Sequence, residues 1–301
     1  LFMPGREKYL NQITESFIAD AAQAFLQAYA AIQGSASADA LFEKHLCLYK
    51  NNGAFSFNSA LSDVNKAAEI CGVRSETAEM VFILFLTERL KELYGEKGYD
   101  ISLFHGVIDD LKAKNDECYT VRGVYGTFVG WWFAGYFDFR LFALGRLQFE
   151  PRHITEDIDL GDRRLNKGDL SIGVHIPSGK PLDISECEKS LKRAYEMFSS
   201  KFPDGTVVFD CTSWLLAPDN RKYMKPDSNI IKFMNLFRIT PSDKNMAHDL
   251  WRIFGTEDCS DTSKLPKDTS LRRIFAELID KGEIPLMGKG IIIMRDGKIV
   301  R

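Results

Sequence analysis

The chain has 301 residues, of which 45% are hydrophobic and 27% are charged, and its formal net charge is −3 at pH 7. This length predicts two domains, each with a hydrophobic core of its own. The nearly balanced charge gives no electrostatic support for nucleic acid as a partner. The six cysteines form no CxxC pair, so the sequence predicts a reduced, cytoplasmic protein without structural zinc.

Membrane and secretion signals are not expected in this sequence. The first residues lack the basic region followed by an apolar one that marks a signal peptide. The longest charge-free segment, residues 123–137, is shorter than the roughly 18 residues that a membrane helix needs. We therefore expect no membrane partner. The aromatic residues of this segment favour a buried helix over about 121–138 that packs two domains together.

Apolar residues recur at helical spacing through the first third of the chain. This periodicity and the capping residues predict helices over 7–33, 37–49, 58–71, 77–93 and 100–114. The fourth is apolar on nearly every side from Met80 to Leu86, so we expect it at the centre of a helical bundle. We expect Gly72 to end the third.

The charge composition changes at the end of this helical part. Up to Asp116 there are 11 basic and 16 acidic residues, and after it there are 28 and 26, so the net charge changes from −5 to +2. The composition and the secondary structure change at the same place. We therefore expect an α-helical domain over 1–116 and a second domain over 117–301.

The second part of the chain contains β-structure. Alternating apolar residues predict strands over 144–150 and 169–177, which are joined by a polar loop and should pair antiparallel. Later elements are expected as helices over 229–236, 246–254 and 267–281, an extended segment over 237–240, and a hairpin over 290–300 that turns at Asp296-Gly297.

Two predicted strands, 169–177 and 206–213, flank a helix that begins near Ser185. This arrangement is typical of a parallel β-α-β unit, whose crossover is almost always right-handed. Ligands in sheets of this kind bind beyond the carboxyl ends of the strands. Those ends are His175 to Ser178 and Asp210 to Ser213, where we expect the functional site.

Four side chains near these strand ends are candidates for catalysis. His175 could act as a general base near neutral pH, or it could be a core histidine bonded to backbone. Glu150 ends the preceding strand, and Tyr223 follows the second parallel strand. Cys211 could be a nucleophile if its pKa were lowered, although a buried, inert cysteine is the more common case. The loop 177–180 offers backbone N–H groups, a hydroxyl and a cation, which suit a phosphate or pyrophosphate.

Other short motifs have simpler interpretations. Asp157, Asp159 and Asp162 resemble part of a calcium loop, but the glycine and distal glutamate placement of an EF-hand is lacking, which favours a solvated hairpin loop. Gly288-Lys289-Gly290 lacks the spacing of a phosphate loop and favours a simple turn. The sequence contains no GxSxG, HExxH or GxGxxG motif, so hydrolase, zincin and Rossmann interpretations have no motif support.

Several stretches of the sequence together resemble a known family. They are Gly145-Arg-Leu-Gln-Phe-Glu150, Gly173-Val-His-Ile-Pro-Ser-Gly179 with Glu186 and Ser190-Leu191, Ser213-Trp-Leu-Leu216, and Ser228-Asn-Ile-Ile-Lys-Phe233. Over nearly its whole length the chain is similar to uncharacterised bacterial acyltransferase-domain proteins. Those proteins join a helical N-terminal domain to a C-terminal domain of the GNAT superfamily of N-acyltransferases.

The resemblance implies an α+β fold, with a helical N-terminal domain followed by a GNAT-like mixed β-sheet flanked by helices. In GNAT enzymes the pantetheine arm of acyl-CoA lies between two splayed parallel strands, which by position are 169–177 and 206–213 here. A Gln/Arg-x-x-Gly-x-Gly/Ala loop after the first of them holds the pyrophosphate. The corresponding loop here, Ser178-Gly-Lys-Pro-Leu-Asp183, keeps one glycine and loses the spacing, so another anchor such as Lys180 would be needed.

The sequence and the resemblance together predict transfer of an acyl group from acyl-CoA or acetyl-CoA to an amine or similar small-molecule acceptor, without a metal. Most of the rate would come from holding donor and acceptor together. We expect Glu150 or His175 as the base and Tyr223 as the acid for the departing thiolate. The co-substrate would contact Ile176, Pro177, Ser178, Gly179, Lys180 and Cys211. The alternative is a GNAT-like scaffold without catalysis, which serves as a small-molecule binding or protein-interaction module.

Overall fold

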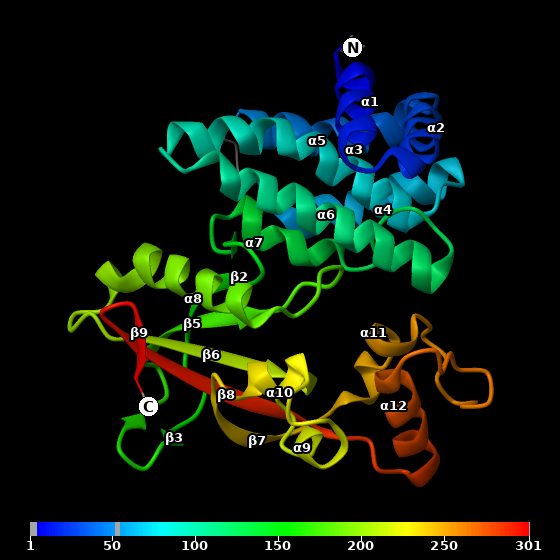
Figure 1. The fold of residues 1–301 in the computed structure, drawn as a ribbon. Coiled ribbons are helices and arrows are strands. Elements are labelled where there is room, and N and C mark those ends of the chain that lie inside the picture. Colours follow the sequence, from blue (N-terminus) through cyan, green and yellow to red (C-terminus); the bar gives the residue numbers. More distant parts are fainter. Residues whose placement is uncertain (1–4, 52–54, 301) are drawn as a thin grey trace. The chain divides into compact units, whose positions relative to one another are not determined.

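The computed structural model describes residues 5–51 and 55–300. Packing divides the chain into two compact units, one up to Arg140 and one from Leu141 onward (Figure 1). Helix α6 (Ile101–Arg122) runs through residue 116, where the change in composition suggested a boundary. Its buried residues continue to Cys118, so the helix packs within the N-terminal unit over most of its length.

The N-terminal unit consists of helices and the segments that join them (Figure 1). Besides α6, the helices are α1 (Arg6–Phe17), α2 (Ala22–Gln33), α3 (Ala36–Lys50), α4 (Phe57–Cys71), α5 (Ser75–Glu96) and α7 (Ala134–Phe137). Helix α5 contacts α1, α2, α3, α4 and α6, and every residue from Met80 to Leu86 is buried. The prediction of a central apolar helix is therefore confirmed. Helix α4 ends at Gly72, which has a φ of 64°, as predicted.

The single helix expected over 7–33 is interrupted in the structure. Ile18 leaves the helical conformation, with φ −143° and ψ 50°, and a short 3-10 helix, η1 (Ala19–Ala21), separates α1 from α2. The side chain of Ile18 is buried. The periodicity predicted the apolar face but not the break, because both halves bury residues at the same helical spacing.

The prediction of an aromatic helix over about 121–138 is wrong. Only η2 (Gly130–Phe133) and α7 are helical in this segment after α6 has ended. Gly126 has a φ of 151°, which no helix allows, and it packs so closely on the carbonyl of Glu76 that a Cβ would overlap it. Two of the aromatic side chains are instead bound to α6, because Trp132 and Tyr136 both donate hydrogen bonds to Asp110 of that helix.

The C-terminal unit is a mixed β-sheet with helices. The strands are β1 (Phe142–Ala143), β2 (Gln148–His153), β3 (Ile158–Asp159), β4 (Arg164–Leu165), β5 (Leu170–His175), β6 (Val207–Ser213), β7 (Arg238–Asn245), β8 (Leu286–Arg295) and β9 (Lys298–Val300). The helices are α8 (Ile184–Phe198), α9 (Asn220–Tyr223), α10 (Asn229–Met234), α11 (Trp251–Phe254) and α12 (Ser270–Lys281), with short 3-10 helices η3 (Ser199–Lys201), η4 (Trp214–Leu216) and η5 (Met246–Asp249).

The main sheet has the strand order β1-β2-β5-β6-β8-β7, with β9 paired to β8. Strands β2 and β5 are antiparallel, and β5 and β6 are parallel, as the sequence predicted. The predicted hairpin at Asp296-Gly297 is formed by β8 and β9. In Figure 1, β6 and β8 run side by side through the middle of the unit.

Different elements cover the two faces of this sheet. Helix α8 buries Cys187, Leu191, Ala194 and Phe198, and the ring of Phe198 packs against Phe142, whose strand partner is Phe149. On the other face, the hairpin of β3 and β4 packs part of its apolar surface on the sheet. The residues of this second core are Ile154, Ile158, Leu165, Val208, Ile291 and Ile293. The aspartate-rich segment over 157–162 is therefore part of a hairpin, as predicted.

The simple turn predicted at Gly288-Lys289-Gly290 is wrong, because these residues lie inside β8. A Cβ at Gly288 would overlap the carbonyl of Leu216, and one at Gly290 would lie 2.8 Å from side-chain atoms of Leu216 and Phe237. The two glycines thus let η4 pack directly on the strand. Glycine in a strand interior indicates close backbone approach as well as turns, and the sequence alone does not distinguish the two.

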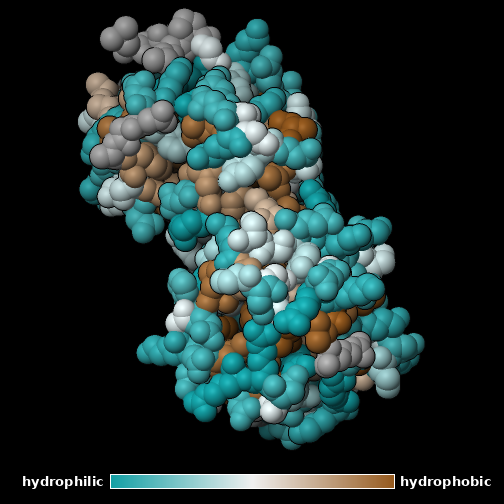
Figure 2. All heavy atoms as spheres, turned by 90° about the vertical axis from the view of Figure 1, so that its left-hand side faces the viewer, coloured by the Kyte–Doolittle hydropathy of each residue, from teal (hydrophilic) through white to brown (hydrophobic). Residues whose placement is uncertain are grey.

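Polar residues cover much of the visible surface of each unit, and hydrophobic residues appear between them in smaller areas (Figure 2). Within residues 5–51 and 55–300, none of the helices combines the length and the apolar character that crossing a bilayer requires.

Candidate functional site

The site lies where the two parallel strands of the C-terminal unit part. Strands β5 and β6 are in register at Ile172 opposite Phe209 and at Gly173 opposite Asp210. Beyond this second pair β5 continues to His175 and β6 to Ser213 without further pairing to each other. Pairing between the two strands therefore ends at Gly173 and Asp210, and the slot denotes here the unpaired strand ends, residues 174–175 and 211–213.

His175 and Glu150 form a hydrogen-bonded pair beside this slot. Glu150 on β2 lies opposite Gly173, and His175 follows Gly173 by two residues on β5, so both side chains lie on one face of the sheet. His175 Nε2 lies 2.9 Å from Glu150 Oε1, and both side chains are about one-quarter exposed. Since a carboxylate oxygen accepts, Nε2 carries the proton, and in the neutral imidazole the lone pair is on Nδ1.

An arginine and an aspartate form a second pair on the same face. Arg152 Nε donates to Asp210 Oδ2 at 3.0 Å, and Arg152 Nη2 donates to both the carbonyl and the Oδ1 of Asp210. Burial by itself would lower the pKa of Arg152, but the hydrogen bonds and charge of Asp210 outweigh it and raise this pKa. The negative charge of Glu150 acts in the same direction, so the guanidinium stays charged between two carboxylates.

The loop after β5 is fixed by a buried arginine. The guanidinium of Arg146 donates to the carbonyls of Pro177, Lys180 and Pro181 at 2.8 to 3.0 Å. The backbone N–H of Arg146 donates to the hydroxyl of Ser190 on α8 at 2.8 Å. The loop carbonyls thus turn toward Arg146, which gives the predicted ligand loop a defined shape.

The N-terminus of α8 follows this loop and is capped by a carboxylate. Asp183 Oδ1 accepts the hydroxyl of Ser185 at 2.8 Å and the N–H of Glu186 at 3.1 Å, and these bonds lower the pKa of Asp183. A negative charge therefore already occupies the position where a helix N-terminus would attract a phosphate. In the loop, Gly179 has a φ of 87°, and the buried Ser178 Oγ has no hydrogen-bond partner in the described structure.

Cys211 and Tyr223 have surroundings that differ from those of the His175–Glu150 pair. Cys211 follows Asp210 on β6, so its side chain points to the opposite face, where it is 1% exposed. Burial raises the pKa of its thiol to about 12, which disfavours a thiolate. The hydroxyl of Tyr223 on α9 donates to Glu283 at 3.3 Å. Partial burial and the charge of Glu283 raise the pKa of Tyr223, so it is protonated at neutral pH.

Arg146 and Arg152 did not emerge as site residues from the sequence, and Asp210 was predicted only as the start of a strand end, without a role. Each acts through partners that are distant in the chain, so no local pattern identifies them. One signal was present, because Gly173 stands in the interior of a strand, where glycine often marks the close approach of another group. A Cβ at Gly173 would lie 2.7 Å from Nε of Arg152.

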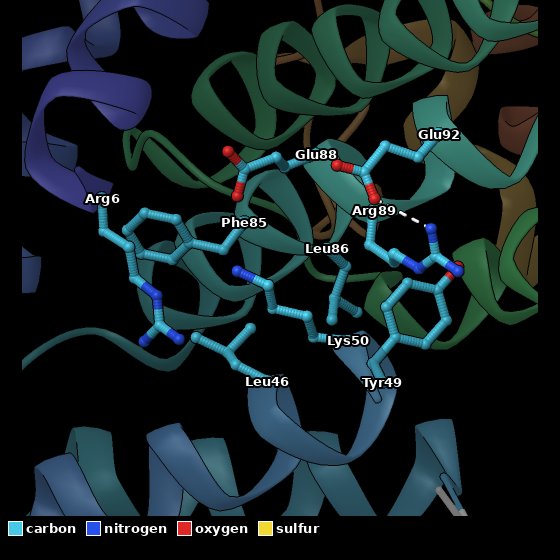
Figure 3. A pocket seen from close by; sticks show the side chains of 9 residues that line it. All are labelled: Arg6, Leu46, Tyr49, Lys50, Phe85, Leu86, Glu88, Arg89 and Glu92. Carbon is cyan, nitrogen blue, oxygen red and sulfur yellow. Dashed lines mark hydrogen bonds and ion pairs between the residues drawn. The ribbon is translucent and has the colours of Figure 1, made fainter. Parts of the chain in front are cut away.

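The N-terminal unit contains a separate small pocket between α1, α3 and α5 (Figure 3). Its volume is about 80 Å³, and Leu46, Phe85 and Leu86 form its apolar lining. In Figure 3, Arg6 lies on one side of it, Tyr49 and Arg89 lie on the other, and the side chain of Lys50 extends between them. Arg89 is paired with Glu92 and Glu96, and Arg6 with Glu43. These ion pairs neutralise the charges of Arg6 and Arg89, so the two arginines have a structural explanation. We therefore place the functional site in the C-terminal unit.

The two parallel strands, with a crossover helix between them, form the mixed-sheet domain that the resemblance to the GNAT superfamily implied. A model of the family described as GNAT-like C-terminal domain matches residues 141–292. The chain therefore belongs to this family, and the resemblance seen in the sequence is confirmed. No curated protein matches the chain.

Solved structures of acyltransferases have a similar fold. One, in complex with decanoyl-CoA and teicoplanin, has a TM-score of 0.62 and 23% identity, and the match covers 76% of this chain and 68% of that one. Another, in complex with decanoyl-CoA, has a TM-score of 0.59 and 21% identity and covers 78% of each chain. At this level of identity the comparison establishes the fold.

Proposed function

We propose that the protein transfers an acyl group from a CoA thioester to an amine or a similar small nucleophile. The observation that carries the proposal is that the pairing of β5 and β6 ends after Gly173 and Asp210, with the His175–Glu150 pair at the unpaired ends. Membership of the GNAT-like family supports it, and so does the similarity in fold to acyltransferases crystallised with decanoyl-CoA.

In the proposed reaction the pantetheine arm lies in the slot and the acceptor amine approaches His175. Nδ1 of His175 takes a proton from the amine while Glu150 holds the ring through Nε2 and stabilises the imidazolium that forms. The amine nitrogen bonds to the acyl carbon, the bond from that carbon to sulfur breaks, and the CoA thiolate leaves. Alignment of donor and acceptor supplies most of the rate.

The remaining predicted site residues lie in the loop after β5, on α9 and on β6. The backbone of Ile176 to Gly179 and the side chain of Lys180 would receive the pantetheine and phosphates, because Arg146 holds this loop in a fixed shape. The raised pKa of Tyr223 suits an acid that protonates the thiolate, but its hydrogen bond runs to Glu283. The burial of Cys211 weighs against the predicted contact with CoA.

The proposal is tested by calorimetric titration of the chain with decanoyl-CoA and acetyl-CoA, followed by release of free thiol with a panel of amines. We expect His175→Asn and Glu150→Gln to lower kcat about 100-fold or more, the usual scale for a general base. His153→Asn is the matched control, since this exposed histidine lies on β2 and bonds only the carbonyl of Gly168 among the described contacts. Failure of the parent protein to bind any CoA ester would refute the proposal.

One observation favours the alternative of a scaffold without catalysis. The carboxylate of Asp183 caps α8, at the point where phosphate groups would otherwise gain from the helix N-terminus. A binding module would bind a small molecule without releasing thiol from any CoA ester. The same titration, followed by the thiol assay, distinguishes the two functions.

A further inference from the structure

Arg152 lies across the strand that separates it from its partner. It extends from β2 over β5 to reach Asp210 on β6, and it can do so because the residue beneath it is Gly173. A Cβ at Gly173 would lie 2.7 Å from Nε and 2.8 Å from Cζ of Arg152. The guanidinium therefore rests directly on the backbone of β5.

This crossing coincides with the point where the two parallel strands part. Gly173 and Asp210 are partners in the β5–β6 register, and they form the second of the two pairs. Arg152 thus ties three strands together at the inner end of the slot. The side chain of Asp210 is 8% exposed and that of Arg152 is 32% exposed, so the carboxylate is buried beneath a half-buried guanidinium that binds it with two nitrogens.

We propose that Arg152, held on Asp210 across Gly173, is a positioning residue that fixes where the acyl-CoA slot begins and how its walls are oriented. The inference rests on the proposed function and names a part of the same site. Arg152 follows Glu150 by two residues on β2, so its side chain lies on the same face of the sheet as the His175–Glu150 pair.

The test is a double-mutant cycle with Arg152→Ala and Gly173→Ala, measured as decanoyl-CoA affinity. Each single change should weaken binding about tenfold or more, because each removes Arg152 from its seat over β5. In the Arg152→Ala background, Gly173→Ala should cost little more, because the added methyl enters space that the arginine has left. Additive losses, or unchanged affinity in both single variants, would overturn the proposal.

A structural role alone would lower the unfolding midpoint without changing the slot. Amide hydrogen exchange is therefore measured at residues 174–176 and 211–213, where Arg152→Ala should speed exchange more than in the remainder of the sheet. Arg164→Ala is the control, because it removes an exposed arginine paired with Asp157 in the same unit. Uniform acceleration, or none, would count against a positioning role.

Two further arms keep the test decisive. Arg152→Lys keeps the charge but loses the forked contact, so its decanoyl-CoA affinity should lie between those of the parent and Arg152→Ala. If the Arg152→Ala variant does not fold, Arg152→Lys takes its place in the cycle. If the parent protein binds no CoA ester, the proposed function fails. Hydrogen exchange at residues 174–176 and 211–213 then still decides whether Arg152 fixes the parting of the strands.

Discussion

The guanidinium of Arg146 donates to the carbonyl of Pro177 at 2.9 Å and so joins the segment before β2 to the loop that leaves β5. Further bonds reach the carbonyls of Lys180 and Pro181, and Arg146 is 8% exposed. The loop has no regular secondary structure between β5 and α8. Its shape therefore depends on one side chain that is distant in the sequence.

Replacement of Arg146 by glutamine should destabilise the C-terminal unit by about 2–3 kcal/mol, because the carbonyls of Pro177, Lys180 and Pro181 lose their charged donor. We also expect weaker decanoyl-CoA binding. Urea unfolding and calorimetry measure the two effects. Lys192→Gln, which removes an exposed cation from α8, is the control and should leave both unchanged. An Arg146→Gln variant with parental stability would show that the loop holds its shape without this residue.

Glu76 in the N-terminal unit should make the free energy of unfolding depend on pH in the acid range. Burial alone would raise its pKa, but hydrogen bonds from Arg74, its own backbone and Arg122 outweigh burial and lower the pKa to about 2. A carboxyl with a lowered folded-state pKa stabilises fully above its unfolded pKa near 4.5, and this stabilisation is lost as pH falls toward 2. The expected loss is up to about 3 kcal/mol.

Thermal unfolding from pH 6 to pH 2 checks this expectation. The midpoint temperature of the parent should fall as the pH falls from 6 to 2. The midpoint of Glu76→Gln should be lower at pH 6 and should fall less steeply. Glu92→Gln is the control, since its carboxylate is mostly exposed in its pair with Arg89. Parallel curves for the parent and Glu76→Gln would contradict the assigned role of Glu76.

Gly126→Ala should destabilise the N-terminal unit strongly. The new Cβ would overlap the carbonyl of Glu76, and the residue has a φ of 151°, so we expect a loss of about 3 kcal/mol or more. Gly161→Ala is the matched control, because Gly161 has a φ of 87° with nothing near its Cβ and should cost only about 1 kcal/mol. Chemical denaturation measures both, and equal losses would show that backbone conformation, not overlap, governs the site.

Cys211 should be inert toward alkylation in the folded protein. Burial raises the pKa of its thiol to about 12, so almost no thiolate is present at pH 8. Cys47 is exposed and should be labelled first by iodoacetamide. Mass spectrometry of the labelled peptides measures the order, and we expect Cys211→Ala to retain decanoyl-CoA binding. Rapid native labelling of Cys211 would restore it as a candidate for ligand contact.

The sequence by itself determined the secondary structure wherever periodicity and capping agree. Helix α5, the end of α4 at Gly72, the parallel β5–β6 unit and the hairpin at Asp296-Gly297 were all predictable. The individual helices, strands and turns depend on side chains within a few residues, where spacing decides which face is apolar, and the length of the crossover predicted the parallel pairing. The prediction of His175 and Glu150 as candidates also rested on local position, at the ends of predicted strands.

Only the tertiary structure decided how these residues meet. The hydrogen bond between His175 and Glu150 needs the antiparallel register of β2 and β5, and the pair of Arg152 and Asp210 needs a third strand as well. The aromatic segment after α6 and the glycines of β8 were predicted wrongly for the same reason. Their conformations follow from backbone groups of Glu76 and Leu216 that lie close in space and far away in the sequence, which no local pattern encodes.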